Sequence, residues 1–150
     1  MRFSIATALA LAVPSLLTAQ VPDLSTATPI SGSWTYATIA GGSEATFADG
    51  SGNAQLWVRC VRVSRRLSIA RPAAVAAPLL NVWTSSLTRG VPASFNPATS
   101  RLTIDLGAWD PLLDAIASSR GRVAFAAGTQ PPLVVPPWAE AARVIEDCRV

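Results

Sequence analysis

Apolar and polar residues alternate along the first two thirds of the chain, a pattern typical of β-strands that bury one face. In residues 55–63, Leu56, Val58 and Cys60 share one face, which we expect to point inward, and Trp57 begins the opposite face. Further strands are predicted at residues 34–39, 44–48, 67–71, 79–85, 86–91, 101–106, 122–127 and 133–135.

Turn-forming residues separate these segments. Gly41-Gly42 and the cluster 49–53 follow the first two strands, and residues 64–66 form a predicted hairpin tip. Asn96-Pro97 marks another turn, and the stretch 72–78, rich in alanine and proline, resembles an insertion. Many short strands joined by such turns predict an antiparallel β-sandwich or a partly open barrel.

Helical periodicity appears only in the last third of the chain. Asp110-Pro111 is typical of a helix start, because Asp accepts a hydrogen bond from the first turn and Pro suits the first helical position. Leu112, Leu113 and Ile116 then fall on one helical face. Gly121 is expected to end this helix in a left-handed cap.

A second helix is predicted to open at Pro136-Pro137, with Pro137 at or near its first position. Four apolar residues form its stripe: Trp138, Ala141, Ala142 and Ile145. Cys148 lies at the edge of that stripe, so docking the helix on the sheet brings it to Cys60. Residues 34–150 show no internal repeat and are predicted to form a single β-rich domain with two short helices in its C-terminal half.

The first residues have the composition of a secretory signal. Met1-Arg2 supplies one positive charge, residues 3–17 are apolar, and Thr18-Ala19 offers a small-residue cleavage site. Residues 1–19 are therefore predicted to direct export, which makes the mature protein periplasmic or secreted. Residues 20–33, rich in Pro, Ser and Thr, form a predicted leader that is flexible or loosely laid on the surface. The mature chain has no stretch long and apolar enough to span a membrane.

The cysteines suit an exported protein. Cys60 and Cys148 are the only two, and in an oxidising compartment such a pair closes into a disulfide. A redox function is disfavoured because the pair lacks the close Cys-x-x-Cys spacing. A loop of this size gives a stabilisation of about 4–5 kcal/mol in the chain-entropy model.

Composition restricts the chemistry further. All 12 basic residues are arginine, and histidine is absent. Without imidazole there is no Ser-His or Cys-His nucleophile pair and no histidine metal ligand, and without lysine there is no Schiff base. We therefore assign no catalytic residue, metal site or cofactor, and acid–base chemistry is left mainly to carboxylates. A net charge of +3 does not indicate a nucleic-acid partner.

The predicted hairpin of residues 55–71 concentrates arginine. Its members are Arg59, Arg62, Arg65, Arg66 and Arg71. Guanidinium groups suit a phosphate or uronic acid group of the cell envelope, although arginines here also serve to keep an exposed edge soluble. Strand alternation places Arg59 and Arg62 on opposite faces.

Five tryptophans are dispersed through separate elements: Trp34, Trp57, Trp83, Trp109 and Trp138. Dispersal favours roles in the core and in helix docking over a sugar-stacking row, with Trp57 and Trp83 expected as the exceptions. The possible ligand surface therefore comprises Trp57, Trp83, Arg59, Arg62, Arg65 and Arg66.

The alternation of Asp49, Ser51 and Asn53 is similar to the start of a calcium loop. The positions that need glycine and glutamate hold Ala54 and Cys60, which favours a plain β-turn.

Carboxylates elsewhere also have structural interpretations. Glu140, Arg143 and Asp147 have the spacing of surface ion pairs on the final helix. Asp110 is a helix cap, and Asp114 lies beside the positive helix start.

Three short motifs carry a resemblance: Ser119-Arg120-Gly121-Arg122 before a strand, Pro136-Pro137-Trp138-Ala139-Glu140, and the ending Glu146-Asp147-Cys148-Arg149. With Cys60, they resemble small exported bacterial proteins of uncharacterised activity that have a disulfide-closed β-sandwich. The resemblance implies that fold but no activity, so no functional residue is carried over.

The sequence thus favours an exported, non-enzymatic module that binds an envelope or periplasmic protein or another cell-envelope component. Two alternatives stay open. One is a small hydrolase that uses two carboxylates, and the other is an inhibitor of wall-degrading enzymes that presents a loop such as 50–53.

Overall fold

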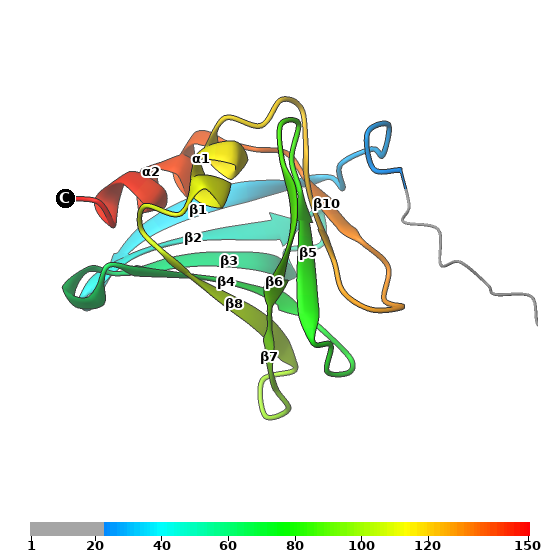
Figure 1. Cartoon of the computed structure of the whole chain (residues 1–150), viewed down its shortest axis with the longest axis horizontal. Coiled ribbons are helices and arrows are strands. Elements are labelled where there is room, and N and C mark those ends of the chain that lie inside the picture. The colour runs from blue at the N-terminus through cyan, green and yellow to red at the C-terminus, as the bar shows by residue number, and fades with distance from the viewer. Residues whose placement is uncertain (1–22) are drawn as a thin grey trace, which may run out of the picture.

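The computed structural model describes residues 23–150, and the predicted signal at residues 1–19 lies outside this part. Two antiparallel sheets dominate it (Figure 1). The six-stranded sheet has the order β1-β2-β3-β4-β8-β7, and the four-stranded sheet has the order β10-β9-β5-β6. The larger sheet consists of β1 (Gly32–Ile39), β2 (Gly42–Asp49), β3 (Ala54–Val61), β4 (Arg66–Pro72), β7 (Ser94–Asn96) and β8 (Arg101–Gly107). The smaller consists of β5 (Leu79–Trp83), β6 (Thr88–Pro92), β9 (Val123–Ala126) and β10 (Leu133–Val135).

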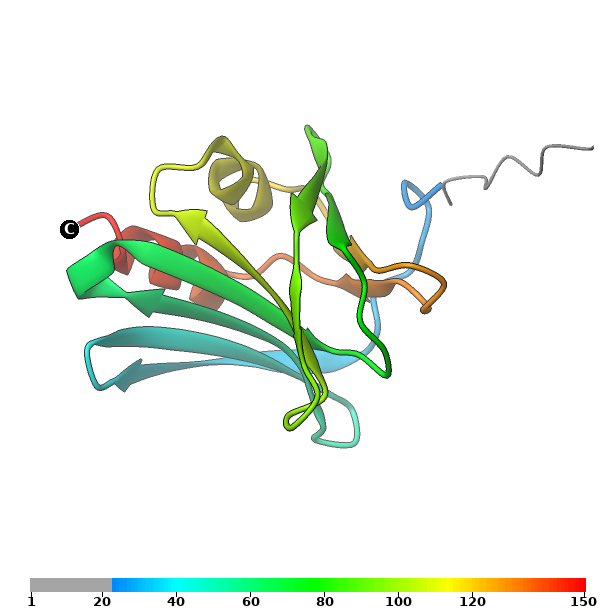
Figure 2. The ribbon, with the colours of Figure 1, turned by 60° about the horizontal axis from the view of Figure 1, so that its bottom comes forward.

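The two sheets face each other without closing into a barrel (Figure 2). The chain passes from the smaller sheet to the larger at Ala93, whose N–H donates to the Pro78 carbonyl at 3.0 Å. Helices α1 (Pro111–Ala117) and α2 (Ala139–Asp147) pack against each other, and α2 lies on β1, β2 and β3. The expected mainly β fold, an antiparallel sandwich or partly open barrel with two helices in the C-terminal half, is therefore confirmed as two antiparallel sheets that do not close.

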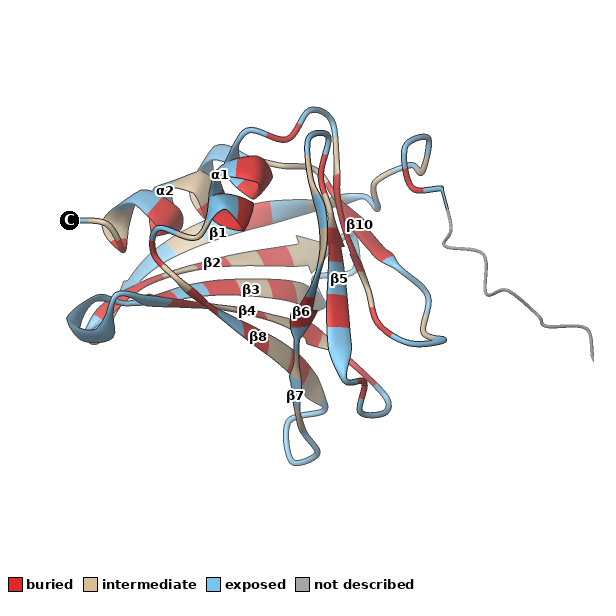
Figure 3. Cartoon of the chain, viewed as in Figure 1, coloured by how far each residue is buried: buried red, intermediate tan, exposed pale blue. Residues whose placement is uncertain are grey.

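Strand alternation decides which side chains form the core (Figure 3). Leu56, Val58 and Cys60 are all at most 2% exposed, as their shared face predicts. They pack with buried residues of both sheets and both helices in one continuous cluster. Full burial of one such aliphatic side chain contributes about 1.5–3 kcal/mol, so this cluster is the main source of stability.

Helix α1 begins where the sequence predicts but ends earlier. Asp110 caps it by accepting a hydrogen bond from the Leu112 N–H at 2.9 Å. The helix ends at Ala117, with Ser118 as the C-cap residue, and the Ser118 hydroxyl donates to the Asp114 carbonyl at 2.7 Å. Gly121 does have a positive φ of 75°, but it lies in the following turn and is not the helix cap.

Asp110 also makes the cap sensitive to pH. Burial raises its pKa, but hydrogen bonds from Arg89 and the Leu112 N–H, together with the Arg89 charge, outweigh burial and leave the pKa below its ordinary value. Replacing Asp110→Ala is expected to lower the free energy of unfolding by about 1 kcal/mol at pH 7.

The direction of the pKa shift predicts how this cost varies with pH. The stabilisation is present above the ordinary carboxyl pKa and is lost as pH falls through the lower folded value. Urea unfolding at neutral pH and at the lowest pH where both proteins stay folded checks this. A difference between wild type and Asp110→Ala that stays constant into acid contradicts it.

Helix α2 starts later than the two prolines predict. It begins at Ala139, with Trp138 as an extended N-cap residue, so Pro137 precedes the helix. A residue before proline is restricted to extended backbone, and the Pro136 carbonyl is held by the Trp34 indole N–H at 2.9 Å.

The apolar stripe of α2 also differs from the predicted one. The buried residues of the helix are Ala141, Val144 and Ile145, and Trp138 is 47% exposed. Periodicity extended back to Trp138 assigns it wrongly because that residue is not helical.

The predicted disulfide is present. Cys60 of β3 and Cys148, directly after α2, are bonded with their Cα atoms 5.5 Å apart, and both are fully buried. The bond fastens α2 to the middle of the larger sheet.

The segment before β1 lies along the smaller sheet. Leu24 is buried against Ala124 and Val134, and the Ile30 N–H donates to the Val134 carbonyl at 2.9 Å. This part of the expected leader is therefore laid on the surface of the domain. Across residues 23–150, no helix is long and apolar enough to cross a membrane.

Candidate functional site

The outer face of the larger sheet carries a shallow hollow of about 240 Å³. We call it the Trp57 hollow and define it by Glu44, Trp57, Arg59, Ser68, Arg101 and Thr103. These side chains come from β2, β3, β4 and β8. Strand alternation positions them: because Leu56 and Val58 face the core, Trp57 and Arg59 must face outward.

An arginine stacks on the central tryptophan of this hollow. The Arg101 guanidinium carbon lies 3.6 Å from the Trp57 ring centroid. This cation–π contact orients both groups and covers one face of the indole. On β4, which lies between them, the register partner of Trp57 is Ala70, and the partner of Ala70 on β8 is Thr103. The small Ala70 side chain leaves the floor of the hollow low.

The opposite flank of the hollow holds an ion pair. Arg59 Nε donates to Glu44 Oε2 at 2.7 Å across the β2–β3 ladder. The terminal nitrogens of Arg59 and the whole Arg101 guanidinium make no hydrogen bond to the described residues. The hollow thus presents two positive groups with unused donors and one carboxylate that is already paired.

Two more of the predicted arginines lie at the end of the β3–β4 hairpin. Strand β3 stops at Val61, and residues 62–64 form a 3-10 turn followed by Arg65 in the left-handed region. Arg65 and Arg66 are exposed, and neither has an ion-pair partner among residues 23–150. Arg66 is the register partner of Val61, so it lies on the outer face near the hollow.

Arg62 is exposed in the 3-10 turn that follows β3 and is not among the residues that line the Trp57 hollow. Its charge helps to lower the pKa of Asp147, the last residue of α2. Because the strand has ended one residue earlier, strand alternation does not determine the direction of the Arg62 side chain.

The structure separates the remaining predicted residues from the hollow. Arg71 faces inward and is buried, with its guanidinium bonded to backbone carbonyls. Trp83 belongs to the smaller sheet and packs, half-buried, against the cluster of Leu24, Ala124 and Val134. The residues of the possible ligand surface therefore do not form one site. Of these residues, Trp57 and Arg59 line the hollow on the outer face of the larger sheet.

Trp57 and Trp83 lie outside the main core cluster, as expected, but they are not the most exposed tryptophans. Both are half-buried, whereas Trp109 is 65% and Trp138 is 47% exposed. Trp109 and Trp138 lie outside regular strands and helices, where periodicity does not predict whether a side chain points inward or outward. Trp34 is the one tryptophan buried in the core, in edge-to-face contact with Phe47 at 5.5 Å.

The segment 49–53 is the predicted turn. The Asp49 carboxylate accepts hydrogen bonds from the Ser51 and Asn53 N–H groups and from the Gln55 side chain. The Asn53 and Gln55 hydrogen bonds are the main cause of a pKa of Asp49 below its ordinary value. The carboxylate that a calcium loop needs is thus already used within the turn.

The predicted ion pairs among Glu140, Arg143 and Asp147 are not formed. Asp147 Oδ2 instead accepts a hydrogen bond from the Tyr36 hydroxyl at 2.7 Å, and Arg143 stacks on the Tyr36 ring at 4.0 Å. Burial raises the pKa of Asp147, but the Tyr36 hydrogen bond and nearby arginine charges outweigh it and keep the pKa low. Helical spacing missed this because the partner lies on β1.

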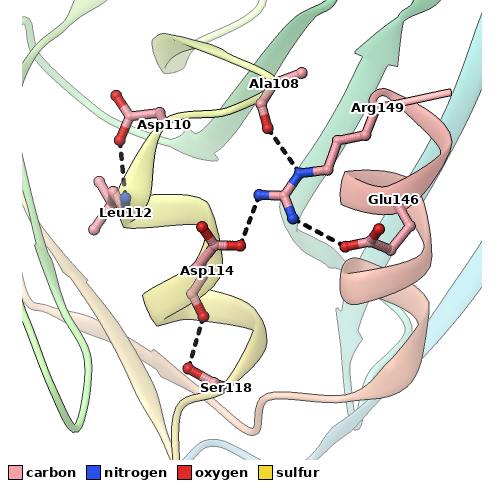
Figure 4. A network of polar contacts seen from close by, with 7 residues as sticks. All are labelled: Ala108, Asp110, Leu112, Asp114, Ser118, Glu146 and Arg149. Atoms are coloured by element: carbon pink, nitrogen blue, oxygen red, sulfur yellow. Dashed lines mark hydrogen bonds and ion pairs between the residues drawn. The ribbon is translucent and has the colours of Figure 1, made fainter.

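Arg149 connects the two helices (Figure 4). Its guanidinium donates to Asp114 at 2.7 Å, to Glu146 at 3.0 Å and to the Ala108 carbonyl at 2.9 Å. Asp114 is therefore an ion-pair partner as well as a residue near the helix start. Only the docking of α2 beside α1 brings these groups together, so no sequence signal identifies the network.

Within residues 23–150, no group of three or more His, Cys, Asp or Glu side chains is placed to hold a metal ion. No protein-family model, curated protein or solved structure matches the chain. The Trp57 hollow is thus the candidate site on the strength of its own residues.

Proposed function

We propose that this protein is an exported, non-enzymatic module that binds an anionic component of the cell envelope in the Trp57 hollow. The observation that carries the proposal is the stack of Arg101 on Trp57 opposite Arg59. Guanidinium groups with unused donors bind carboxylate or phosphate in a forked geometry and discriminate against neutral ligands. The rigid sheet holds both groups in place, so little conformational entropy is lost on binding.

The other side chains of the hollow suit a carbohydrate that carries the anion. Ser68 and Thr103 supply hydroxyl groups that donate to or accept from sugar hydroxyls. The part of the Trp57 ring that Arg101 leaves uncovered offers an apolar surface for the CH groups of a sugar ring. Export is supported by the composition of residues 1–19 and by the buried disulfide.

The two alternative functions have less support. A carboxylate hydrolase needs two acids on either side of the bond that is cleaved, whereas Glu44 is the only acid of the hollow and is paired with Arg59. An inhibitor presenting residues 50–53 has in its favour that the turn is exposed and held by Asp49. That turn, however, carries no aromatic, aliphatic or charged side chain to anchor a partner.

Calorimetric titration with two anionic probes tests the proposal: an oligogalacturonate and a glycerol-phosphate oligomer. At least one of these probes is expected to bind, with an affinity that falls as salt is added. A neutral galactan of equal length is not expected to bind. Trp57→Ala and Arg101→Gln are each expected to weaken binding about tenfold or more, since a hydrogen bond to a charged group contributes about 1.5–3 kcal/mol.

Matched variants control for the loss of a tryptophan and of an arginine elsewhere. Trp109→Ala and Arg120→Gln change exposed residues outside the hollow and are expected to leave binding unchanged. Equal binding of the neutral galactan, no binding of either anionic probe, or full affinity in Trp57→Ala overturns the proposal.

A further inference from the structure

Strand β1 (Gly32–Ile39) forms an open edge of the larger sheet. Among residues 23–150 it pairs only with β2, in an unbroken register from Gly32 opposite Asp49 to Ile39 opposite Gly42. The strand has 8 residues and contains no charged residue and no proline. Charges, prolines and bulges are the usual devices that keep an edge strand from pairing with another strand. This edge has none of them.

A groove of about 490 Å³ runs between this edge and helix α2. Its β1 side consists of Trp34, Thr35 and Tyr36, and its α2 side includes Glu140 and Arg143. Arg143 is fixed over the Tyr36 ring at 4.0 Å. Neither Glu140 nor Arg143 has an ion-pair or hydrogen-bond partner among residues 23–150. The groove therefore carries an unpaired carboxylate, Glu140, and a guanidinium without an ion-pair partner, Arg143. Both lie next to the free edge of β1.

We propose that β1 pairs in antiparallel fashion with β1 of a second copy of this chain, which joins two larger sheets into one. A two-fold axis through Thr35 places Trp34 opposite the partner's Tyr36. The start of α2 lies beside Trp34, because the indole bonds to Pro136, whereas Arg143 lies over Tyr36. The same axis therefore brings Glu140 towards the partner's Arg143 and, by symmetry, Arg143 towards the partner's Glu140.

Charge complementarity selects a second copy over an unrelated peptide. A two-fold interface satisfies both unpaired charges with residues the chain already has, and the uncharged strand adds no repulsion at the axis. An extended peptide from another protein needs an acid and a base at matching positions to do the same. In that case this protein alone stays monomeric.

Sedimentation velocity of the purified protein, from micromolar to submillimolar concentration, measures the dimer. The wild type is expected to dimerise. Thr35→Lys is expected to raise the dissociation constant of the dimer about tenfold or more, because it places two ammonium groups opposite each other at the axis. Thr46→Lys is the matched control: Thr46 is the register partner of Thr35 on β2, one strand away from the edge. Circular dichroism verifies that each variant is folded.

Charge reversal tests the register. Glu140→Arg and Arg143→Glu are each expected to weaken the dimer, and the double variant is expected to recover it, because the two charges are exchanged across the axis. A wild type that stays monomeric throughout overturns the proposal, as does a Thr35→Lys variant that dimerises like wild type. A double variant no stronger than the singles overturns the Thr35 register.

Discussion

The double variant Cys60→Ala/Cys148→Ala is expected to lose about 4–5 kcal/mol of the free energy of unfolding. The bond joins residues 88 positions apart, so it restricts the unfolded chain over most of the domain. In the folded state it fastens α2 to β3, where both sulfur atoms are buried in the core. Urea unfolding followed by far-UV circular dichroism measures the loss.

Two comparisons distinguish this effect from a local one. Wild type under reducing conditions is expected to unfold at the same urea concentration as the double variant, because both lack the cross-link. If only α2 detached, the slope of the main transition would fall, since less surface is exposed in that step. A double variant within about 1 kcal/mol of wild type contradicts the expected role of the bond.

Replacing Arg71→Ala is expected to lower the free energy of unfolding by about 3 kcal/mol. The side chain is 8% exposed as a residue and donates to the carbonyls of Phe125 at 2.6 Å, Pro131 at 3.1 Å and Pro72 at 3.2 Å. It therefore links β4 of the larger sheet to β9 and to the loop before β10. Burial lowers the pKa of Arg71, and its truncation leaves buried carbonyl groups without a donor.

Matched substitutions separate this role from the loss of any arginine. Arg71→Lys is expected to recover only part of the stability, because an ammonium group cannot reproduce the planar arrangement of donors. Arg120→Ala removes an exposed arginine and is expected to stay within about 0.5 kcal/mol of wild type. Thermal and urea unfolding measure the stability of each variant. An Arg71→Ala variant as stable as Arg120→Ala contradicts this prediction.

Arg71 also shows a signal that sequence reasoning passed over. It shares the inward face of β4 with Leu67 and Ile69, at strict two-residue spacing. Grouping it with the other arginines of the hairpin treats it as a surface residue, whereas alternation alone places it inside. Its carbonyl partners on β9 and beyond were not predictable, because they lie more than fifty positions away.

The candidate site likewise has one part that the sequence predicts and one part that it does not. Alternation predicts that Trp57 and Arg59 face outward from β3, and they do. Arg101 joins them because β4 pairs with β8 across the sheet. Strand order depends on long-range contacts that no local pattern specifies. The stacking of Arg101 on Trp57 therefore could not be predicted from the sequence.

By itself the sequence determined which residues of β3 face inward, that two helices follow the strands, and that Cys60 pairs with Cys148. These features depend on short-range periodicity and on having only two cysteines. The tertiary structure alone decided which strands are neighbours, where α2 begins, and how Arg149 and Tyr36 find their partners. Those outcomes depend on the docking of segments far apart in the chain, because each group takes the partner that packing brings within reach.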